Sequence, residues 1–480
     1  WMFSRTDNFN QDISDWDVSN VTDMSYMFLN AIALSDENKC AIQASFQSND
    51  AWPYDWSDLC ELEGYTYVPD DNFEQALIDL GYDDTLDDFV LTENISGVTE
   101  LNVDSKEISD LTGIEDFTAL TTLRCNHNQL TSLDVSSNTA LTSLLVNYNS
   151  LTSLDVSSNT VLTQLWFYGN SLTSLDVSNN PDLNSILCES NQLTSLDLSA
   201  NTALTSLRCW NNQLTSLDVS NNTALEYLEC YTNSLTSLDV SNNTALTELI
   251  CSSNQLTSLD VSNNTALTIL KCSDNQFTSL DVSTNTDLMI LRCEGNQLTS
   301  LDVSANTALT DLYSYDNQMI HLNMKNGVTD QLTGFDATDN SFDCIEVNAE
   351  DVDYATANWT SANGNIDEGV EFSVVCAPEG YTYVPDNNFE QALIDLGYDD
   401  TLDDYVLTAN ISGVTSLDVK EKEISDLTGI EGFTALTNLH CEVNELTSLD
   451  VSSNTALTDL SCGHNELTSL DVSSNTALTY

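Results

Sequence analysis

Basic residues are scarce in this 480-residue chain. Lys and Arg together number 10 against 76 Asp and Glu, so the formal net charge is −66. A surface of this kind repels the phosphates of nucleic acids and the headgroups of anionic membranes. We therefore expect that the chain has no nucleic-acid partner. We also expect a secreted protein whose charge keeps it in solution. Because 41% of the residues are hydrophobic, the chain can still bury a core.

Long apolar segments are also missing. No run of about 18 apolar residues occurs, so the sequence predicts no transmembrane helix. No signal peptide is recognisable. The chain begins at Trp1 and stops inside a repeat at Tyr480. We interpret it as a fragment, in which absent targeting segments say nothing about location.

Catalytic motifs are absent as well. The four histidines, His127, His321, His440 and His464, are isolated in the sequence. None of the patterns HExxH, GxSxG, P-loop or GxGxxG occurs. Carboxylates are abundant, but a glycosidase needs a specific pair of them in a pocket. We predict that the chain is not an enzyme and needs no cofactor.

A 21-residue repeat is the strongest positive signal. A typical unit, residues 204–224, reads LTSLRCWNNQLTSLDVSNNTA, and ten units run from Leu120 to the one that starts at Leu309. In LxxLxC the apolar residues alternate, which predicts a short strand with one buried face. One unit cannot bury its apolar side alone, so the units must stack. With parallel strands about 4.8 Å apart, the array should be about 45–50 Å long.

An asparagine occupies the ninth place of every unit, from Asn128 to Asn317. A buried asparagine can satisfy backbone donors and acceptors where the chain turns out of the strand. Stacked copies are therefore predicted to form a ladder. Leucines at the eleventh and fourteenth places, such as Leu214 and Leu217, should fill the rest of the core.

The pattern LxxLxCxxNxL resembles the leucine-rich repeat. A 22-residue unit that starts at Val98 is similar to the repeats of internalin-type proteins. Near the N-terminus, Met2-Phe3 and Met27-Phe28 are 25 residues apart, and with FNQDIS and WDVSNVTDM this segment resembles the BspA-like surface-protein repeat. These resemblances imply a leucine-rich-repeat solenoid with short parallel strands on one face and turns or irregular loops on the other. They also imply a secreted or surface-anchored bacterial protein of the Bacteroidetes type.

A long duplication divides the chain. EGYTYVPDDNFEQALIDLGYDD at Glu63 returns, with one change, at Glu379. Each copy predicts a short helical cap of the kind that a solenoid end needs. In the first copy Asp71 and Glu74 have capping-box spacing, and Phe73, Leu77 and Leu80 fall on one helical face.

Seven parts follow from these patterns. They are a truncated 25-residue repeat (1–34), a disulfide-closed cap or linker (35–62), a helical cap (63–97), the main array (98–342), a disulfide-closed C-terminal cap (343–378), a second helical cap (379–413) and a second, truncated array (414–480).

The thirteen cysteines divide into two groups. Nine lie at the sixth place of a unit, where we expect small buried hydrophobic side chains: Cys125, Cys188, Cys209, Cys230, Cys251, Cys272, Cys293, Cys441 and Cys462. Neighbouring copies would be somewhat too far apart for an unstrained disulfide, and parallel thiols cannot surround a metal. The other four lie between modules, and we predict the bridges Cys40–Cys60 and Cys344–Cys376. Each bridge should stabilise the fold by about 3–4 kcal/mol and requires an oxidising compartment.

Sequence variation is concentrated on one predicted face. In LxxLxCxxN the third, fifth, seventh and eighth residues should point away from the core, whereas TSLDVS hardly changes between units. From Leu120 to Leu309 every basic residue lies at the fifth place. Candidate ligand-binding residues at the fifth and seventh places are Arg124, Trp166, Tyr168, Arg208, Trp210, Tyr231, Lys271, Arg292, Tyr313 and Tyr315. We expect Trp166, Trp210, Tyr231, Tyr313 and Tyr315 to be exposed. Relaxed constraint on exposed positions is one explanation of the variation, and a diversified binding surface is the other.

An aspartate is nearly constant at the fifteenth place, from Asp134 to Asp302. The favoured interpretation is an Asx-type turn, in which each carboxylate accepts nearby backbone N–H groups. The alternative is calcium that bridges successive loops, with an asparagine such as Asn222 as a further ligand.

The sequence thus predicts a non-enzymatic recognition or adhesion protein on a bacterial cell surface or outside the cell. Its strand-lined face would bind a protein or a polysaccharide. Two other hypotheses stay open. The chain could be a passive structural spacer, or it could be the repeat region of a larger secreted enzyme whose catalytic domain lies outside residues 1–480.

Overall fold

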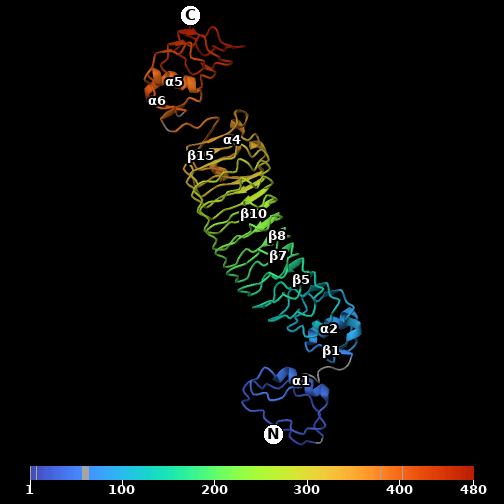
Figure 1. Ribbon diagram of the computed structural model, residues 1–480. Helices are drawn as coiled ribbons and strands as arrows, with labels where there is room; N and C mark the ends of the chain where they lie inside the picture. The colour runs from blue at the N-terminus through green and yellow to red at the C-terminus, as the bar shows by residue number, and fades with distance from the viewer. Residues whose placement is uncertain (1, 7, 57–63, 379, 403, 480) are drawn as a thin grey trace. The chain divides into compact units, whose positions relative to one another are not determined.

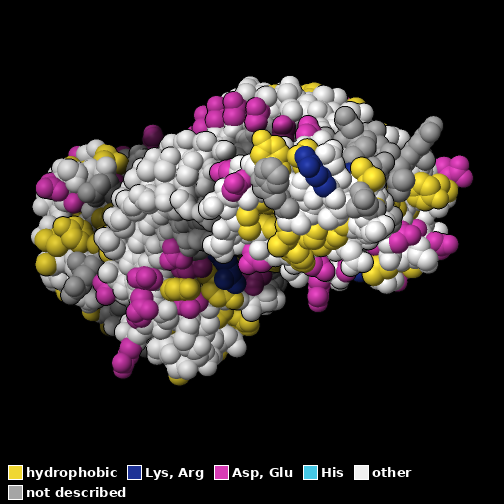
Figure 2. All heavy atoms as spheres, turned by 90° about the horizontal axis from the view of Figure 1, so that it is seen from below, with side chains coloured by type: hydrophobic (Ala, Val, Ile, Leu, Met, Phe, Trp, Pro, Cys, Tyr) yellow, Lys and Arg dark blue, Asp and Glu magenta, His cyan; other side chains and the backbone are white. Residues whose placement is uncertain are grey.

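The computed structural model describes residues 2–6, 8–56, 64–378, 380–402 and 404–479 (Figure 1). The chain divides into two compact parts. One comprises residues 1–319, 331–341 and 361–367, and the other comprises residues 320–330, 342–360 and 368–480. Asp and Glu side chains far outnumber Lys and Arg on the face shown in Figure 2. No helix in the described ranges has the length and apolar character to cross a bilayer.

The N-terminal segment packs around one small core. Backbone bonds join chain positions about 25 residues apart, from Phe3 N to Met27 O (2.9 Å) and from Arg5 N to Leu29 O (2.7 Å). Helix α1 (Asp36–Phe46) begins after Ser35, whose side chain accepts a bond from Asn38 N. Its residues Ile42 and Phe46 join the same core as the residues before position 34. The predicted boundary between residues 34 and 35 therefore lies inside one packed unit.

The first helical cap contains β1 (Tyr65–Tyr67), α2 (Asp71–Leu80), β2 (Phe89–Leu91) and α3 (Thr92–Ile95), with β1 and β2 antiparallel. The predicted capping box was wrong by one residue. Asp70, not Asp71, caps α2 by accepting bonds from Asn72 N and Phe73 N. Phe73 and Leu77 are buried as predicted, but Leu80 is 45% exposed, because the core-facing stripe of α2 ends one turn earlier.

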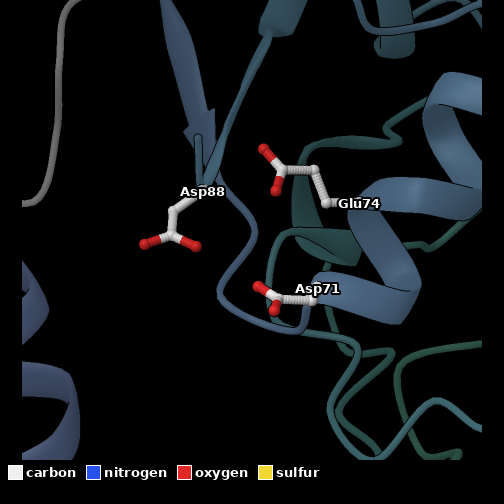
Figure 3. Close-up of side chains that lie close together, drawn as sticks. All are labelled: Asp71, Glu74 and Asp88. Atoms are coloured by element: carbon white, nitrogen blue, oxygen red, sulfur yellow. The ribbon is translucent and has the colours of Figure 1, made fainter. Parts of the chain in front are cut away.

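An acidic group lies beside this cap helix (Figure 3). Carboxylate oxygens of Asp71, Glu74 and Asp88 lie within 4.8 Å of one another, and the described residues contain no other set of three or more His, Cys, Asp or Glu side chains this close together. Glu74 is buried, and its Oε1 accepts bonds from Asp87 N (2.8 Å) and Phe89 N (3.2 Å). Burial raises the pKa of Glu74 to about 7. Its hydrogen bonds show that it ties α2 to the loop before β2.

A parallel sheet of twelve strands, counted over the described residues, forms one side of the main array. The central apolar residues of successive strands stand opposite one another, as Leu207 does to Ile186 and Leu228, which confirms the 21-residue register. In chain order the strands are β3 (Glu100–Asn102), β4 (Thr122–Arg124), β5 (Ser143–Leu145), β6 (Gln164–Trp166), β7 (Ser185–Leu187), β8 (Ser206–Arg208), β9 (Tyr227–Glu229), β10 (Glu248–Ile250), β11 (Ile269–Lys271), β12 (Ile290–Arg292), β14 (Asp311–Tyr313) and β16 (Gly334–Asp336). A further strand, β13 (Ser300–Asp302), lies in the TSLDVS half of its unit.

The core of each unit consists of the predicted residues. Leu204, Leu207, Cys209 and Leu214 have no exposed surface, and Leu217 has 6%. Outside its three-residue strand, each unit bonds to the next through backbone amides, for example from Cys209 N to Glu229 O (2.8 Å). The predicted solenoid, with its apolar side buried by stacking, is therefore confirmed.

The predicted asparagine ladder is also confirmed. Asn212 Nδ2 donates to the carbonyl oxygens of Cys188 and Cys209 (both 3.1 Å), and Asn212 Oδ1 accepts from Leu193 N (3.0 Å). The residue before it, at the eighth place, has a left-handed backbone in unit after unit, as at Asn211 (φ 53°) and Gly169 (φ 69°). The ladder satisfies the backbone at this sharp turn.

The TSLDVS half carries a second asparagine ladder. Asn222 is completely buried, and its Nδ2 donates to Leu198 O (3.2 Å) and Asn201 O (2.8 Å). Asp218 Oδ1 accepts from Ser220 N (2.9 Å), and this bond recurs at each fifteenth-place aspartate from Asp134 to Asp302. The predicted Asx-type turn is thus confirmed. Bonds from Ser220 lower the pKa of Asp218, so the carboxylate stays charged.

The second compact part contains the end of the main array and the second copy of the cap. Its strands are β15 (His321–Asn323), β17 (Cys344–Glu346), β18 (Glu371–Ser373), β19 (Tyr381–Tyr383), β20 (Tyr405–Leu407), β21 (Ser416–Asp418), β22 (Asn438–His440) and β23 (Asp459–Ser461). Its helices are α4 (Val352–Asn358), α5 (Asn387–Asp395) and α6 (Thr408–Ile411). Asp386 caps α5 as Asp70 caps α2, and β21, β22 and β23 pair in parallel.

One predicted disulfide is confirmed. Cys344 and Cys376 are bonded, with their Cα atoms 5.6 Å apart. Cys40 is buried in α1, but its predicted partner Cys60 lies outside the described residues. The nine sixth-place cysteines are free thiols, and all but the partly buried Cys462 are buried. Burial raises the pKa of the Cys251 thiol to about 12, so this cysteine is an inert core residue.

Candidate ligand-binding face

We call the solvent side of strands β4 to β12 and β14, with the residue pair that follows each strand, the strand-lined face. Arg124 and Arg208 are exposed on it, whereas the other eight candidate residues are partly buried. The prediction that Trp166, Trp210, Tyr231, Tyr313 and Tyr315 are exposed was wrong in degree. Neighbouring units are only one strand spacing apart, so large side chains on this face cover one another.

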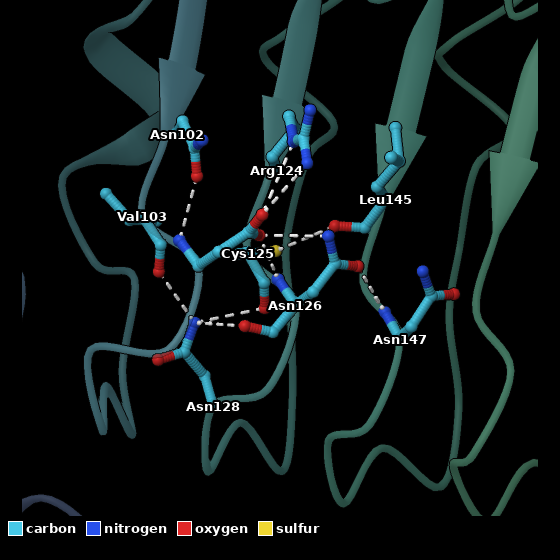
Figure 4. Close-up of polar contacts among 9 residues, drawn as sticks. Asn102, Val103, Arg124, Cys125, Asn126, Asn128, Leu145 and Asn147 are labelled. Atoms are coloured by element: carbon cyan, nitrogen blue, oxygen red, sulfur yellow. Dashed lines mark hydrogen bonds and ion pairs between the residues drawn. The ribbon is translucent and has the colours of Figure 1, made fainter.

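The seventh place is less open than predicted. Asn126, Asn147, Glu189, Ser273 and Glu294 occupy it and are all buried. At the start of the array the reason is visible in Figure 4, where Asn126 Oδ1 accepts from Asn147 N (2.9 Å). Side chains at this place thus bond along the solenoid. At the fifth place Leu145 is also buried, with 8% exposure.

The arginines on the face already have partners within it. Arg124 Nη2 lies 3.2 Å from Asp104 Oδ2, and Arg208 Nε lies 3.1 Å from Glu229 Oε1. The Arg292 guanidinium carbon lies 4.3 Å from the ring centre of Tyr313, a cation–π contact. Lys271, one strand before Arg292, is partly buried. The structure therefore places the four basic side chains on one face and holds three of them against a neighbouring unit.

Aromatic rings form a row beside the strand ends. His127 stacks on Tyr148 (centroids 4.5 Å apart), and Tyr148 meets Tyr168 edge to face (5.1 Å). After one unit without a ring, Trp210 stacks on Tyr231 with centroids 5.0 Å apart and 9° between the planes. The fifth-place ring of Trp166 is held by a bond from its Nε1 to Ser185 Oγ (3.1 Å).

Gly169 makes room for this row. It occupies the eighth place with φ 69°, and a Cβ atom there would lie 2.7 Å from the ring of Tyr148. Most other units carry a side chain at the eighth place, as His127 and Asn211 do. Glycine is therefore required at position 169 by the neighbouring ring as well as by the backbone.

A buried carboxylate fills the gap in the row. Glu189 lies at the seventh place between the units of Tyr168 and Trp210, with 6% exposure, and its Oε2 has no hydrogen-bond partner among the described residues. Burial raises the pKa of Glu189 to about 7, while the charge of Arg208 acts in the opposite direction. Glu294, five units further on, is also buried with an unpartnered Oε2 and a pKa raised by burial.

These carboxylates and part of the aromatic row were missed by the sequence prediction. His127 and Tyr148 lie at the eighth place, which was predicted to be open, and the predicted ligand-binding residues lie only at the fifth and seventh places. Glu189 and Glu294 stood in the variable seventh place, yet acidic residues are so common in this chain that two more gave no signal. The useful signal would have been a lone acid between aromatic residues in successive units.

Comparison with known proteins relates the chain to bacterial repeat proteins. A family model described as "Mycoplasma protein of unknown function, DUF285" matches residues 1–49. Internalin J of Listeria monocytogenes is 36% identical over 72 residues, which are 15% of this chain and only 8% of that relative. The solved functional domain of InlJ from Listeria monocytogenes, described as including a cysteine ladder, is 32% identical, with a TM-score of 0.53. That match covers 86% of this chain and 74% of the InlJ chain.

A more distant match shows the fold alone. The plant peptide hormone receptor RGFR1, solved in complex with RGF2, is 17% identical, with a TM-score of 0.50. The match covers 78% of this chain and 68% of the receptor chain. These comparisons indicate a leucine-rich-repeat fold and no catalytic family.

Proposed function

This chain belongs to the internalin-like leucine-rich-repeat proteins, and on that premise we propose that it is a non-enzymatic recognition protein that binds a ligand on its strand-lined face. The ligand would be a protein or a polysaccharide on another surface. The residues that we propose to contact it are the ten candidates at the fifth and seventh places, among them Trp210 and Arg208.

The observation that carries the proposal is the one-sided distribution of side chains. All four basic residues between Leu120 and Leu309, and the rings of Trp166, Tyr168, Trp210 and Tyr231, lie on the strand-lined face. The TSLDVS half is nearly constant, and its aspartates are engaged in turns. Trp, Tyr and Arg are the residue types that dominate binding energy at protein interfaces.

Extracellular location is part of the same proposal. The Cys344–Cys376 bridge supports it, because such bridges persist in oxidising compartments. We assign the chain to the bacterial cell surface or the secreted fraction, with the BspA-like N-terminal segment and the Bacteroidetes type as its finer affiliation. The division of the chain into parts also belongs to this proposal, except that residues before and after the boundary at 34 and 35 share one core.

A screen of glycan and protein arrays with the 480-residue chain tests the function. For a ligand found in this way, Trp210→Ala and Arg208→Glu should each weaken capture at least about tenfold, since residues of these types cost about 2 kcal/mol or more at binding hot spots. Thermal melting should show that both variants keep the fold.

Two control variants separate the face from general effects. Thr215→Ala alters an exposed side chain in the constant half of the same repeat unit. Lys422→Glu makes the same charge change as Arg208→Glu in the second array, where Lys422 pairs with Asp395 of the second cap (3.3 Å). Neither should affect capture. Unchanged capture by all four variants would support the passive spacer instead.

A further inference from the structure

We infer that Glu189, with Trp210 on one side and Tyr168 on the other, forms a seat for a Lys or Arg side chain of a protein partner. The inference rests on the proposed function and narrows it, because it names a cationic side chain as the group that the face binds. Its basis is the geometry of three consecutive repeat units.

One face of the Trp210 ring is directed toward the repeat unit that carries Glu189. Its other face is covered by Tyr231, which stacks on it with 9° between the planes. Strand β8, from which Trp210 follows, lies between β7 and β9 in the sheet. Because Tyr231 follows β9, the opposite face of Trp210 is directed to the unit of β7, and Glu189 follows β7. Backbone bonds keep these units adjacent, from Ser190 N to Trp210 O (3.0 Å) and from Gly169 N to Glu189 O (3.0 Å).

The compensation of the Glu189 carboxylate is incomplete, because burial outweighs the bond from its own backbone N–H and the charge of Arg208. Its Oε2 is buried without a hydrogen-bond donor among the described residues. A carboxylate removed from water costs several kcal/mol unless a cation or donors compensate it. A cation that approaches the remaining 6% of exposed surface would supply that compensation. An aromatic face beside a carboxylate is the combination that favours ammonium and guanidinium groups.

The charged groups around Glu189 leave this task to an outside cation. Arg208 on β8 is the nearby base, but its Nε is 3.1 Å from Glu229 on β9. Glu229 adds a second negative charge near Glu189, and the hydroxyls of Tyr168 and Tyr231 also lie within its electrostatic range. The formal charge of −66 on the whole chain favours the approach of a basic partner over longer distances.

The ring geometry favours a cation over a sugar. Sugars stack on open ring faces, but Trp210 and Tyr231 cover each other, as do His127 and Tyr148. Rings stacked along the solenoid present their edges to a ligand. The open face of Trp210 is directed toward the repeat unit that carries the carboxylate of Glu189, and this arrangement favours a cation over a neutral sugar.

A related cluster occurs five units further on. Glu294 is buried with an unpartnered Oε2, and Tyr315 is close enough for Glu294 to raise the pKa of its hydroxyl. Arg292 is held over Tyr313 at 4.3 Å. At about 4.8 Å per strand the two glutamates are roughly 24 Å apart along the array. A basic segment of a protein could therefore contact both.

The test uses short peptides whose only charged group is one central Lys or Arg, titrated into the full chain and followed by ligand-observed NMR. Acetyl-lysine and citrulline peptides of the same sequence are the neutral probes. We expect the cationic peptides to bind at least about tenfold more tightly than the neutral ones. Glu189→Gln, which keeps the shape of the side chain, should weaken cationic binding about tenfold, and Trp210→Leu should weaken it severalfold.

Asp182→Asn is the charge-matched control, because Asp182 is exposed in the turn outside the strand-lined face. It should leave binding unchanged. Equal loss in Asp182→Asn and Glu189→Gln would show attraction by the general negative field and overturn the seat. So would equal binding of neutral peptides, or no binding of any cationic peptide by a folded protein.

Binding of neutral oligosaccharides would distinguish the cation seat from the proposed function. If neutral oligosaccharides bind, and Trp210→Leu abolishes this binding while Glu189→Gln does not, the cation seat fails and the proposed function stands. If Trp210→Ala and Arg208→Glu both capture a ligand from the array screen as well as the wild-type chain does, the proposed function fails as well.

Discussion

At the scale of single residues, the strand-lined face contains several groups that lower the stability of the folded state. Glu189 and Glu294 are buried acids with one unpartnered oxygen each. Gly169 gives up side-chain packing so that the Tyr148 ring can lie over the next unit. The leucines beneath need no such arrangement, because they gain from burial alone. Costs of this kind at a surface are typical of positions kept for binding rather than for stability.

The cost of Glu189 should appear as a pH-dependent difference from Glu189→Gln. Its pKa is raised from 4.5 to about 7 by burial, so the native state holds a proton that the unfolded chain has lost between these pH values. Wild-type stability therefore falls relative to the glutamine variant as pH rises through this range. The variant should be about 2–3 kcal/mol more stable at pH 8 and equal to wild type near pH 4. Thermal melts of both proteins at several pH values measure this, and a constant difference would contradict it.

Gly169 and Tyr148 should be energetically coupled. Gly169→Ala introduces a Cβ atom 2.7 Å from the Tyr148 ring, so the variant should lose about 1–3 kcal/mol through overpacking. In a Tyr148→Ala background the same substitution should cost about 1 kcal/mol less, since only the left-handed backbone remains unfavourable. A double-mutant cycle by thermal or urea unfolding gives the coupling. Additive effects would mean that the ring moves aside freely.

At the scale of the repeat, the sequence predicted most of the fold. Residues that face inward recur with the same spacing, so Leu207, Cys209 and Asn212 could be assigned to core and turn from the period alone. The cap was predicted less well. Asp70 and Asp71 are adjacent acids, and only the backbone geometry shows which of them accepts the helix N–H bonds.

The sequence predicted where the proposed binding face lies, but not how exposed its side chains are or which neighbours they contact. Alternation predicts which residues point outward, whereas exposure depends on what the neighbouring unit carries. Trp210 is partly buried because the residue 21 positions later is Tyr231, whose ring stacks on it. Glu189 is buried between units that carry larger side chains at the same place. Contacts between side chains of successive units depend on rotamers, which a periodic pattern does not specify.

The repeat core should behave as a sum of its layers. Leu217→Ala removes buried methyl groups from one layer and should cost about 2–5 kcal/mol. Thr215→Ala, two residues earlier and exposed, should change stability by less than about 0.5 kcal/mol. Urea unfolding followed by circular dichroism compares the two variants. Equal effects would contradict the assignment of Leu217 to the core.

At the scale of the whole molecule, the net charge of −66 opposes the compact state. The fifteenth-place aspartates contribute to this, because they recur in nine successive units. Bonds from Ser220 lower the pKa of Asp218, which keeps this carboxylate ionised. Screening by salt shortens the range of the repulsion from about 30 Å at 0.01 M to about 8 Å at 0.15 M. Monovalent salt should therefore raise the melting temperature of the full chain by several degrees over this interval.

Thermal melting also distinguishes screening by salt from specific binding of calcium to the fifteenth-place aspartates. In the confirmed turns each aspartate is satisfied by a backbone N–H, as Asp218 is by Ser220 N, so stacking does not require an ion. Addition of EGTA at constant ionic strength should leave the melting temperature unchanged, and calcium should act no more strongly than magnesium at equal concentration. A drop of several degrees with EGTA, restored by calcium alone, would instead establish the bridging ion. Substituting Asp218→Asn, which can keep the Asx turn but removes a charge, should then weaken the calcium effect, whereas without a bound ion it should slightly stabilise the array by relieving repulsion.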